Sequence, residues 1–227
     1  MTPTKRALDL TIAILLALLL WPVLVLVMLV MLVREGRPVL YISERMRTPE
    51  QAFRLFKLRT MRPGADRSGG VTGGDKAAAM SRLHMLLRAS RADELPQLWN
   101  VIRGDMSLVG PRPPLRAYVE AYPEIYAQVL QSRPGITGLA TLRFHAHEER
   151  LLADCLTPDE TDAVYRRRCI PRKARLDLIY QRRRTLCLDL RLIAETGLKP
   201  LRLARAGQPR APTGTSSART GGIQPRR

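Results

Sequence analysis

Residues 90–114 (SRADELPQLWNVIRGDMSLVGPRPP) contain side chains that could do chemistry on a phosphate group. Asp93 and Glu94 are adjacent, and three arginines lie near them in the sequence: Arg88, Arg91 and Arg112, the last in a Gly-Pro-Arg-Pro-Pro turn. Guanidinium groups bind phosphate oxygens, while carboxylates can hold Mg²⁺ or attack phosphorus. The spacing therefore indicates two metal ligands, or one metal ligand and one nucleophile.

The same two acids have a structural interpretation, because acidic side chains near a helix N-terminus commonly interact with the helix dipole. Ser90 is expected to cap this helix, with Asp93 as the reciprocal acid of a capping box. Leu95, Leu98, Trp99 and Ile102 would then share one apolar face. Successive helical side chains diverge by about 100°, which suits different roles for Asp93 and Glu94 better than joint chelation of one ion.

An uncharged apolar segment, residues 10–33, is long enough to cross a bilayer as a helix. It is too long for a signal peptide and has no small-residue cleavage site, so we expect it to remain as a membrane anchor. Pro22 lies in its middle, where it favours a kink. Both flanks are basic, which gives a mixed orientation signal. A kinked re-entrant helix and a single span are both compatible with the residues alone.

The rest of the chain predicts a mainly helical domain with a few short strands. Residues 39–47 and 53–61 read as strands, with Lys57 in the second, and residues 62–75 read as a loop. Helices are expected over 76–89 and over 115–131, and a further helix is expected to start at a Thr157 cap. Residues 133–142 read as a turn followed by a strand. Amphipathic helices are expected over 172–204, and the tail from residue 207 is expected to be disordered. His84 is expected to pack rather than to act in catalysis.

Composition narrows the choice of partner. The formal charge of +18 favours nucleic acid, anionic lipid or phosphorylated small molecules, but only 5% of the residues are aromatic, which does not favour stacking on single-stranded nucleic acid. Three separated cysteines, Cys155, Cys169 and Cys187, indicate reduced thiols. His145 and His147 lack a third ligand cluster and are expected at the surface.

Four segments together resemble the bacterial sugar transferase family, the monotopic polyprenyl-phosphate phosphoglycosyl transferases. They are KRALDLTIAI, FRLFKLRTM, DELPQLWNVIRGDMSLVGPRPP and RPGITGLATL, in the family's order from about residue 4 to about residue 200. The chain is similar to the minimal catalytic form of that family. The continuation RFHAHEERLL differs from many members, so the resemblance does not identify the sugar.

The resemblance implies a role for each site residue. Asp93 would attack the sugar-proximal phosphate of a UDP-sugar and release UMP, and Glu94 would be a ligand of a required Mg²⁺. Lys57, Arg88 and Arg112 would bind phosphate. Trp21 and Pro22 fall where the family breaks its re-entrant helix. Polyprenyl phosphate would then attack the aspartyl phosphosugar and give polyprenyl-diphosphate-sugar, the first membrane step of glycan assembly.

The resulting expectation is an α+β protein with three regions. These are a re-entrant membrane anchor (1–36), a compact, mainly helical cytosolic catalytic domain with interfacial amphipathic helices (37–206), and a disordered basic tail (207–227). Expected partners are the UDP-sugar, undecaprenyl phosphate and lipids of the bacterial inner membrane, and no nucleic acid is expected. The sequence is compatible with a homodimer. The active site would lie on the cytoplasmic face. The alternative is a non-catalytic, membrane-tethered basic module that binds anionic lipid or nucleic acid.

Overall fold

A computed structural model describes residues 1–61 and 80–206. Three predicted features therefore lie outside the described residues: the loop at 62–75, the first residues of the helix predicted over 76–89, and the tail from residue 207. Within them the chain mixes helices with two small sheets, which confirms the predicted α+β class. The predicted boundary after residue 36 falls where the first helix ends.

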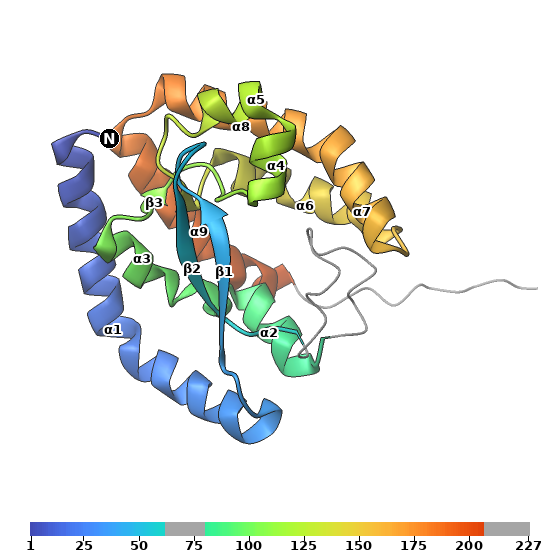
Figure 1. The fold of residues 1–227 in the computed structure, drawn as a ribbon. Helices are drawn as coiled ribbons and strands as arrows, with labels where there is room; N and C mark the ends of the chain where they lie inside the picture. The colour runs from blue at the N-terminus through green and yellow to red at the C-terminus, as the bar shows by residue number, and fades with distance from the viewer. Residues whose placement is uncertain (62–79, 207–227) are drawn as a thin grey trace, which may run out of the picture.

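The chain begins with one long helix, α1 (Pro3–Glu35), which contains the predicted apolar segment. The Thr2 hydroxyl caps α1 by accepting a hydrogen bond from the Lys5 amide at 3.3 Å. Pro22 lies inside the helix, and Figure 1 shows that α1 changes direction part of the way along. By length and composition α1 could cross a membrane, and few side chains of its apolar stretch are buried. The apolar helix is confirmed, and its re-entrant path stays a prediction.

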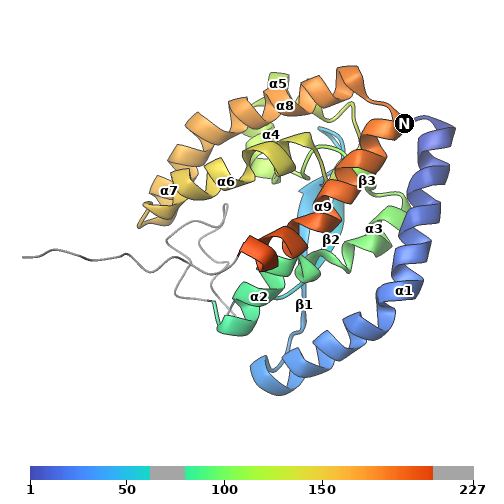
Figure 2. The same ribbon diagram turned by 180° about the vertical axis from the view of Figure 1, so that it is seen from behind.

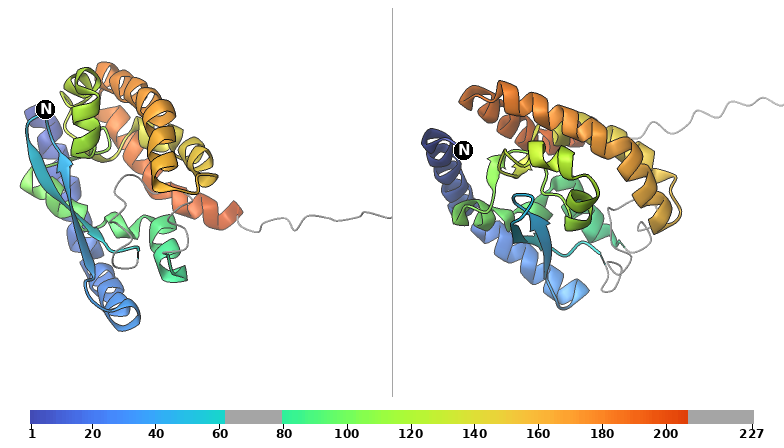
Figure 3. Two further views of the ribbon diagram at one scale, coloured as in Figure 1. Left: turned by 45° about the vertical axis from the view of Figure 1, so that its right-hand side comes forward. Right: turned by 45° about the horizontal axis from the view of Figure 1, so that its top comes forward.

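The two predicted strands form an antiparallel hairpin, β1 (Leu40–Met46) and β2 (Ala52–Leu58). Its register pairs Tyr41 with Lys57 and Arg45 with Phe53, so these side chains project from the same face. That face is the more buried one along both strands. Figure 1 and the right view of Figure 3 show the hairpin between α1 on one side and the later helices on the other.

The segment around the two acids differs from the prediction. Helix α2 (Arg82–Ser90) runs through Ser90, whose hydroxyl donates to the Leu86 carbonyl at 2.8 Å, so Ser90 does not cap the following helix. Arg91 ends α2 in the left-handed conformation, with φ of 58°. A 3₁₀ turn, η3 (Ala92–Glu94), follows, and helix α3 (Gln97–Arg103) begins only after it. Trp99 is 55% exposed, whereas Leu98 is buried, so the predicted apolar face of this segment is divided.

The remaining elements are β3 (Ser107–Val109), α4 (Arg116–Ala121), α5 (Pro123–Val129), β4 (Gly135–Thr137), α6 (Leu139–Ala153), α7 (Pro158–Val164), the π-type turn η4 (Tyr165–Cys169), α8 (Ile170–Arg183) and α9 (Leu186–Ala206). The Thr157 cap of α7 is confirmed, with the Thr157 hydroxyl accepting from the Glu160 amide at 3.2 Å. The helix predicted over 115–131 is two helices, because Pro123 starts a new one. The strand predicted within 133–142 is short, since α6 already starts at Leu139.

Strands β3 and β4 pair in parallel, and the apolar side chains of β3 belong to one of the core clusters. One cluster joins the first half of α1 to α3, β3 and α9 through Ala13, Val101, Val109 and Leu192. A second cluster fills the space among α4 to α8. Figure 2 shows α9 crossing the back of the molecule diagonally. Cys155, Cys169 and Cys187 are free thiols, as predicted, with only Cys187 exposed.

Candidate active site

The turn η3 places both acids in a partly enclosed position. Asp93 and Glu94 are each 7% exposed. Because Arg91 is left-handed, the chain reverses between α2 and α3, and the acids lie between two helices rather than at the start of one. A buried carboxylate needs partners or a raised pKa. The two side chains meet this requirement in different ways.

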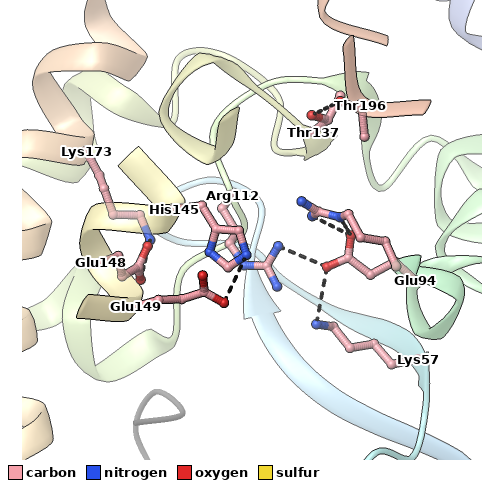
Figure 4. A network of polar contacts seen from close by, with 10 residues as sticks. Lys57, Glu94, Arg112, Thr137, His145, Glu148, Glu149, Lys173 and Thr196 are labelled. Carbon is pink, nitrogen blue, oxygen red and sulfur yellow. Dashed lines mark hydrogen bonds and ion pairs between the residues drawn. The ribbon is translucent and has the colours of Figure 1, made fainter. Parts of the chain in front are cut away.

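Glu94 is surrounded by cations (Figure 4). Its Oε2 accepts from Arg91 Nη2 at 2.7 Å, and its Oε1 accepts from Arg112 Nη1 at 3.0 Å. Lys57 Nζ lies 3.8 Å from Oε1. Burial opposes ionisation, but Arg112, Arg91 and Lys57 together lower the pKa of Glu94 to about 2. Glu94 is therefore a fixed anion that holds two arginines in place.

Asp93 has no such partners. Among residues 1–61 and 80–206, no hydrogen bond or ion pair reaches its carboxylate. Burial and the neighbouring Glu94 raise the pKa of Asp93, and the charges of Lys57, Arg112 and Arg88 only partly offset this. A carboxylate that is close to cations but not bonded to them keeps its lone pairs available. Of the two acids, Asp93 is the one with oxygens free to react.

Arg112 reaches the acids from a rigid turn after β3. The Gly110 amide donates to the Thr137 carbonyl at 2.9 Å, and the Gly135 amide donates to the Pro111 carbonyl at 2.8 Å. A Cβ at Gly110 would lie 2.2 Å from the Arg133 carbonyl oxygen, so only glycine fits there. The Arg112 side chain is 39% exposed and retains donors for a ligand. The Gly-Pro-Arg-Pro-Pro sequence thus presents a guanidinium with little backbone freedom.

Beside Arg112, a small hollow is lined by Arg45, Leu55, Lys57, Gln97, Arg112 and Pro113. Burial lowers the pKa of Lys57 to about 8, and repulsion from Arg112 adds to this effect. Burial and Arg112 also lower the pKa of Arg45. Close cations whose charged forms are disfavoured gain stability when an anion binds between them. The hollow is suited to a phosphate group.

Two residues of this hollow were not predicted as site residues. Arg45 lies on the same face of the hairpin as Lys57, and the alternation of side chains in residues 39–47 could have placed it there once the register was known. Gln97 is buried, and its Nε2 has no partner among the described residues. Nothing in the sequence singles out Gln97. Its unused N–H groups add donors to the hollow.

The other predicted site residues take different positions. Arg88 donates from Nε to Thr60 Oγ1 at 2.9 Å and is close enough to lower the pKa of Asp93. Trp21 and Pro22 lie in the apolar part of α1, and Trp21 is 59% exposed. The structure thus groups Asp93 and Glu94 with Lys57, Arg112 and Arg88 and leaves Trp21 and Pro22 in the apolar part of α1.

The three histidines, His84, His145 and His147, lie in packing or surface positions. His84 is fully buried and completes a capping box with Ser81, which confirms its packing role. His145 Nε2 lies 3.5 Å from Glu149 Oε1, and His147 Nε2 lies 3.0 Å from Arg172 Nη1, both at the surface. Over residues 1–61 and 80–206 no group of three histidine, cysteine or acidic side chains is placed to share an ion. Surface positions for His145 and His147 are therefore confirmed.

Comparison with known proteins identifies the family of the chain. The sequence profile of the bacterial sugar transferase family matches residues 1–202. The chain is 43% identical over 146 residues to a UDP-glucose:undecaprenyl-phosphate glucose-1-phosphate transferase of Caulobacter vibrioides, which covers 61% of this chain and 53% of that protein. It is 30% identical over 201 residues to a transferase of the same name from Xanthomonas campestris, covering 87% of this chain and 38% of that protein.

A third relative is the uncharacterized sugar transferase EpsL of Bacillus subtilis, 37% identical over 138 residues, with 61% of this chain and 67% of that protein covered. The chain thus spans about half the length of the Caulobacter vibrioides relative. The family profile, in contrast, covers the anchor, the hairpin, the two acids and both small strands. The chain belongs to the bacterial sugar transferase family.

Proposed function

We propose that this protein transfers a sugar phosphate from a UDP-sugar to undecaprenyl phosphate and releases UMP. The observation that carries the proposal is a buried carboxylate, Asp93, that accepts no hydrogen bond from the described residues and lies close to the cations of a small hollow. The names of the relatives support an undecaprenyl-phosphate acceptor and a nucleotide-sugar donor. The product is undecaprenyl-diphosphate-sugar, the first lipid-linked intermediate of a glycan.

The first half of the reaction is an attack by an Asp93 oxygen on the sugar-proximal phosphorus of the donor. A bond forms between Asp93 and phosphorus, the bond from that phosphorus to the oxygen bridging to UMP breaks, and UMP leaves with the electron pair. In the second half, a phosphate oxygen of undecaprenyl phosphate attacks the same phosphorus and releases Asp93 as a carboxylate. One carboxylate thereby serves a soluble donor and a lipid acceptor in turn.

The cations around Asp93 stabilise charge on the transferring group, which is the main catalytic task in phosphoryl transfer. Arg112 and Lys57 line the hollow and contact or approach Glu94, so Glu94 fixes where their charges point. Arg45 and Gln97 line the same hollow and add donors. Arg88 is placed near Asp93 by its bond to Thr60.

The two acids fit a Mg²⁺ ion that shares its coordination with substrate. Mg²⁺ in phosphate-handling enzymes is commonly held by one or two carboxylates, with phosphate oxygens and water completing an octahedron. Each carboxylate oxygen has two lone pairs; Arg91 Nε and Nη2 both donate to Oε2 of Glu94, and Arg112 Nη1 donates to Oε1. Oε1 of Glu94 and the oxygens of Asp93 are therefore the positions that would hold a metal ion, which when bound would offset the charge of the donor diphosphate.

We further propose that α1 enters and leaves the membrane by its cytoplasmic face. Basic residues flank both ends of the apolar segment, and α1 changes direction within its length. The last two helices carry exposed apolar side chains at Ile179, Leu186 and Leu190 beside many arginines, which suits contact with anionic inner-membrane lipid. Cysteine labelling at residue 2 tests this topology, because periplasmic labelling would contradict it.

The competing function is a basic module that binds anionic lipid or nucleic acid without chemistry, and product analysis separates the two. Membranes containing the protein, supplied with a panel of UDP-sugars, Mg²⁺ and undecaprenyl phosphate, should release UMP with at least one donor. Asp93→Asn should abolish the release, whereas Asp154→Asn, at an exposed aspartate at the end of α6, should not. Release of UDP, or of no nucleotide from any donor, would refute the proposal.

A further inference from the structure

A second group of buried polar side chains connects α1 to the strand that precedes Arg112. We define the α1–β3 cluster as Lys5, Asp9, Ser107, Tyr180 and Asp189. All five residues are at most 4% exposed. They come from α1, β3, α8 and α9, so four segments that are distant in the sequence meet here.

Two carboxylates and one ammonium group form the centre of the cluster. Lys5 Nζ donates to Asp189 Oδ2 at 2.7 Å and lies 3.7 Å from Asp9 Oδ1. The Tyr180 hydroxyl oxygen lies 2.6 Å from Asp189 Oδ1. The Ser107 hydroxyl oxygen lies 2.7 Å from Asp9 Oδ2. Every carboxylate oxygen in the cluster thus has a donor nearby, which keeps both charges stable in a buried position.

The cluster also contacts the backbone of β3 on the edge that β4 leaves unpaired. Asp9 Oδ1 accepts from the Leu108 amide at 3.4 Å. The hydroxyl oxygens of Ser107 and Tyr180 lie 3.0 and 3.2 Å from the Val109 carbonyl oxygen. Buried backbone groups at a strand edge need partners. Here side chains of α1 and α8, and of β3 itself, take the place that a third strand would occupy.

This edge matters because the chain runs from Val109 through Gly110 and Pro111 directly to Arg112. Gly110 and Pro111 are fixed on their other side by hydrogen bonds with Thr137 and Gly135. A stiff two-residue connection transmits a displacement of Val109 to Arg112. Arg112 in turn contacts Glu94 at 3.0 Å. The α1–β3 cluster is therefore connected to Glu94 through residues 107–112 and the Arg112 side chain.

We infer that Tyr180 and the α1–β3 cluster are positioning residues, which hold Arg112 where it can bind the transferring phosphate. This inference rests on the proposed function. By this inference, Lys5 and Asp9 in the first turns of α1 help to position Arg112 for catalysis, in addition to the part of α1 in membrane anchoring. A small misplacement of a phosphate-binding group is costly to the rate, so loss of one hydroxyl in this cluster should be visible in turnover.

The test compares two substitutions that each remove one buried tyrosine hydroxyl. Tyr180→Phe removes the contacts with Asp189 and Val109. Tyr118→Phe is the matched control, because Tyr118 is also buried and donates to Asp162 Oδ1 at 2.7 Å, but belongs to the other core cluster. We expect Tyr180→Phe to lower kcat/KM for the UDP-sugar about tenfold, and Tyr118→Phe to leave it within about twofold. Equal losses in the two variants would overturn the inference.

A double-mutant cycle with Arg112→Lys then asks whether Tyr180 acts through Arg112. If it does, the effect of Tyr180→Phe should shrink to about twofold or less in the Arg112→Lys background. A full tenfold loss in both backgrounds would mean that Tyr180 acts independently and would contradict the inference. Ser107→Ala replaces Tyr180→Phe in the cycle if the latter variant does not accumulate in membranes.

Amide hydrogen exchange of the ligand-free protein provides a readout that does not need turnover. Tyr180→Phe should speed exchange in residues 107–113, and Tyr118→Phe should not. Unchanged exchange there in Tyr180→Phe would overturn the positioning role. If wild-type protein released no UMP while exchange responded as expected, the proposed function would fail and the structural link between Tyr180 and the Arg112 turn would stand.

Discussion

Two buried charged clusters contact the same segment of the chain, one at each end of residues 107–112, and they are built differently. In the α1–β3 cluster, each oxygen of Asp9 and Asp189 has a donor, and Lys5 lies between the two carboxylates. In the candidate active site, Glu94 takes the short contacts with arginine, while Asp93 accepts no bond from the described residues. The site also has more cations than acids.

The comparison distinguishes buried charges that stabilise the fold from buried charges that are placed to bind a ligand. A buried charge whose oxygens all have donors is held in one position by its partners. A buried carboxylate without partners is costly, and nearby cations with lowered pKa values are costly until an anion binds to them, so the combination marks a candidate functional site. By this criterion Asp9 and Asp189 belong to the scaffold, Asp93 is the candidate for the chemistry, and Glu94 contacts Arg112, which follows the strand that the scaffold holds.

The largest expected contrast is between Asp93→Asn and Asp9→Asn. Asp93→Asn should lower turnover at least about a thousandfold without changing thermal stability, because it removes the proposed nucleophile, whose carboxylate accepts no bond from the described residues. Asp9→Asn should lower the melting temperature and cost only about tenfold in turnover, because the amide oxygen can still accept from Ser107. UMP release and thermal unfolding in detergent measure both. Comparable turnover in the two variants would remove the distinction between the clusters.

Glu94→Gln should have the next largest effect, about a hundredfold in turnover. An amide has one acceptor oxygen and no charge, so it cannot hold Arg91 and Arg112 together as Glu94 does. If Glu94 also binds Mg²⁺, the variant should need more Mg²⁺ for half-maximal rate. Titration of Mg²⁺ in the UMP assay checks this, with Glu120→Gln, at an exposed position on α4, as the control. An unchanged Mg²⁺ requirement would exclude Glu94 as a metal ligand.

The pH dependence of kcat/KM should reflect Asp93 on the acid side and Lys57 on the basic side. The pKa of Asp93 is raised, so activity should fall with decreasing pH earlier than for an ordinary aspartate nucleophile. The pKa of Lys57 is lowered to about 8, so its charge, and with it phosphate binding, should be lost as the pH rises through that value. Lys57→Arg should move the basic limb to higher pH, since arginine stays charged.

Lys173→Arg is the control for the basic limb. Lys173 is also buried, but Tyr165 and Glu148 outweigh burial and raise its pKa. Its substitution should leave the limb in place. In Figure 4 the Lys173–Glu148 pair lies on the far side of Arg112 from Glu94. If the basic limb moved in Lys173→Arg and stayed in place in Lys57→Arg, the limb would reflect Lys173 and not Lys57, which would contradict the prediction.

The smallest expected effect concerns Asp177 in α8, a buried acid outside both clusters. Burial raises its pKa to about 7, Lys173 only partly opposes this, and its Oδ1 has no partner among the described residues. The folded state thus holds a proton that the unfolded chain releases near pH 4, so stability falls as the pH rises from about 4 to about 7. Asp177→Asn should add roughly 1–2 kcal/mol at pH 8. The gain should shrink at pH 5, and melting temperatures at the two pH values check it.

The sequence predicted those parts of the fold that depend on local pattern. The uncharged run predicted α1, two short segments of mixed apolar and basic residues predicted β1 and β2, and the Thr157-Pro158 pair predicted the start of α7. The prediction of helix ends was wrong where the same few residues could either continue a helix or end it. Ser90 could have capped the next helix, but Arg91 adopts the left-handed conformation instead, and α2 takes Ser90 as its last residue.

The site was predictable only in part for a related reason. The resemblance grouped Asp93, Glu94, Lys57, Arg88 and Arg112, but Arg45 requires the register of the hairpin, and Gln97 requires the direction of α3 after the η3 turn. The α1–β3 cluster joins Lys5 to Asp189, and no local spacing rule reaches across that separation. Long-range contacts of this kind are set by packing, which the sequence does not display.

The most direct test of the account is the mass of the protein after incubation with a UDP-sugar and Mg²⁺ and without undecaprenyl phosphate. We predict a mass increase equal to one phosphosugar, located on a peptide that contains Asp93, absent in Asp93→Asn, and accompanied by one equivalent of UMP. Addition of undecaprenyl phosphate should then remove the adduct. Full turnover with the acceptor, but no adduct and no UMP without it, would mean direct transfer between the substrates and would contradict Asp93 as the nucleophile.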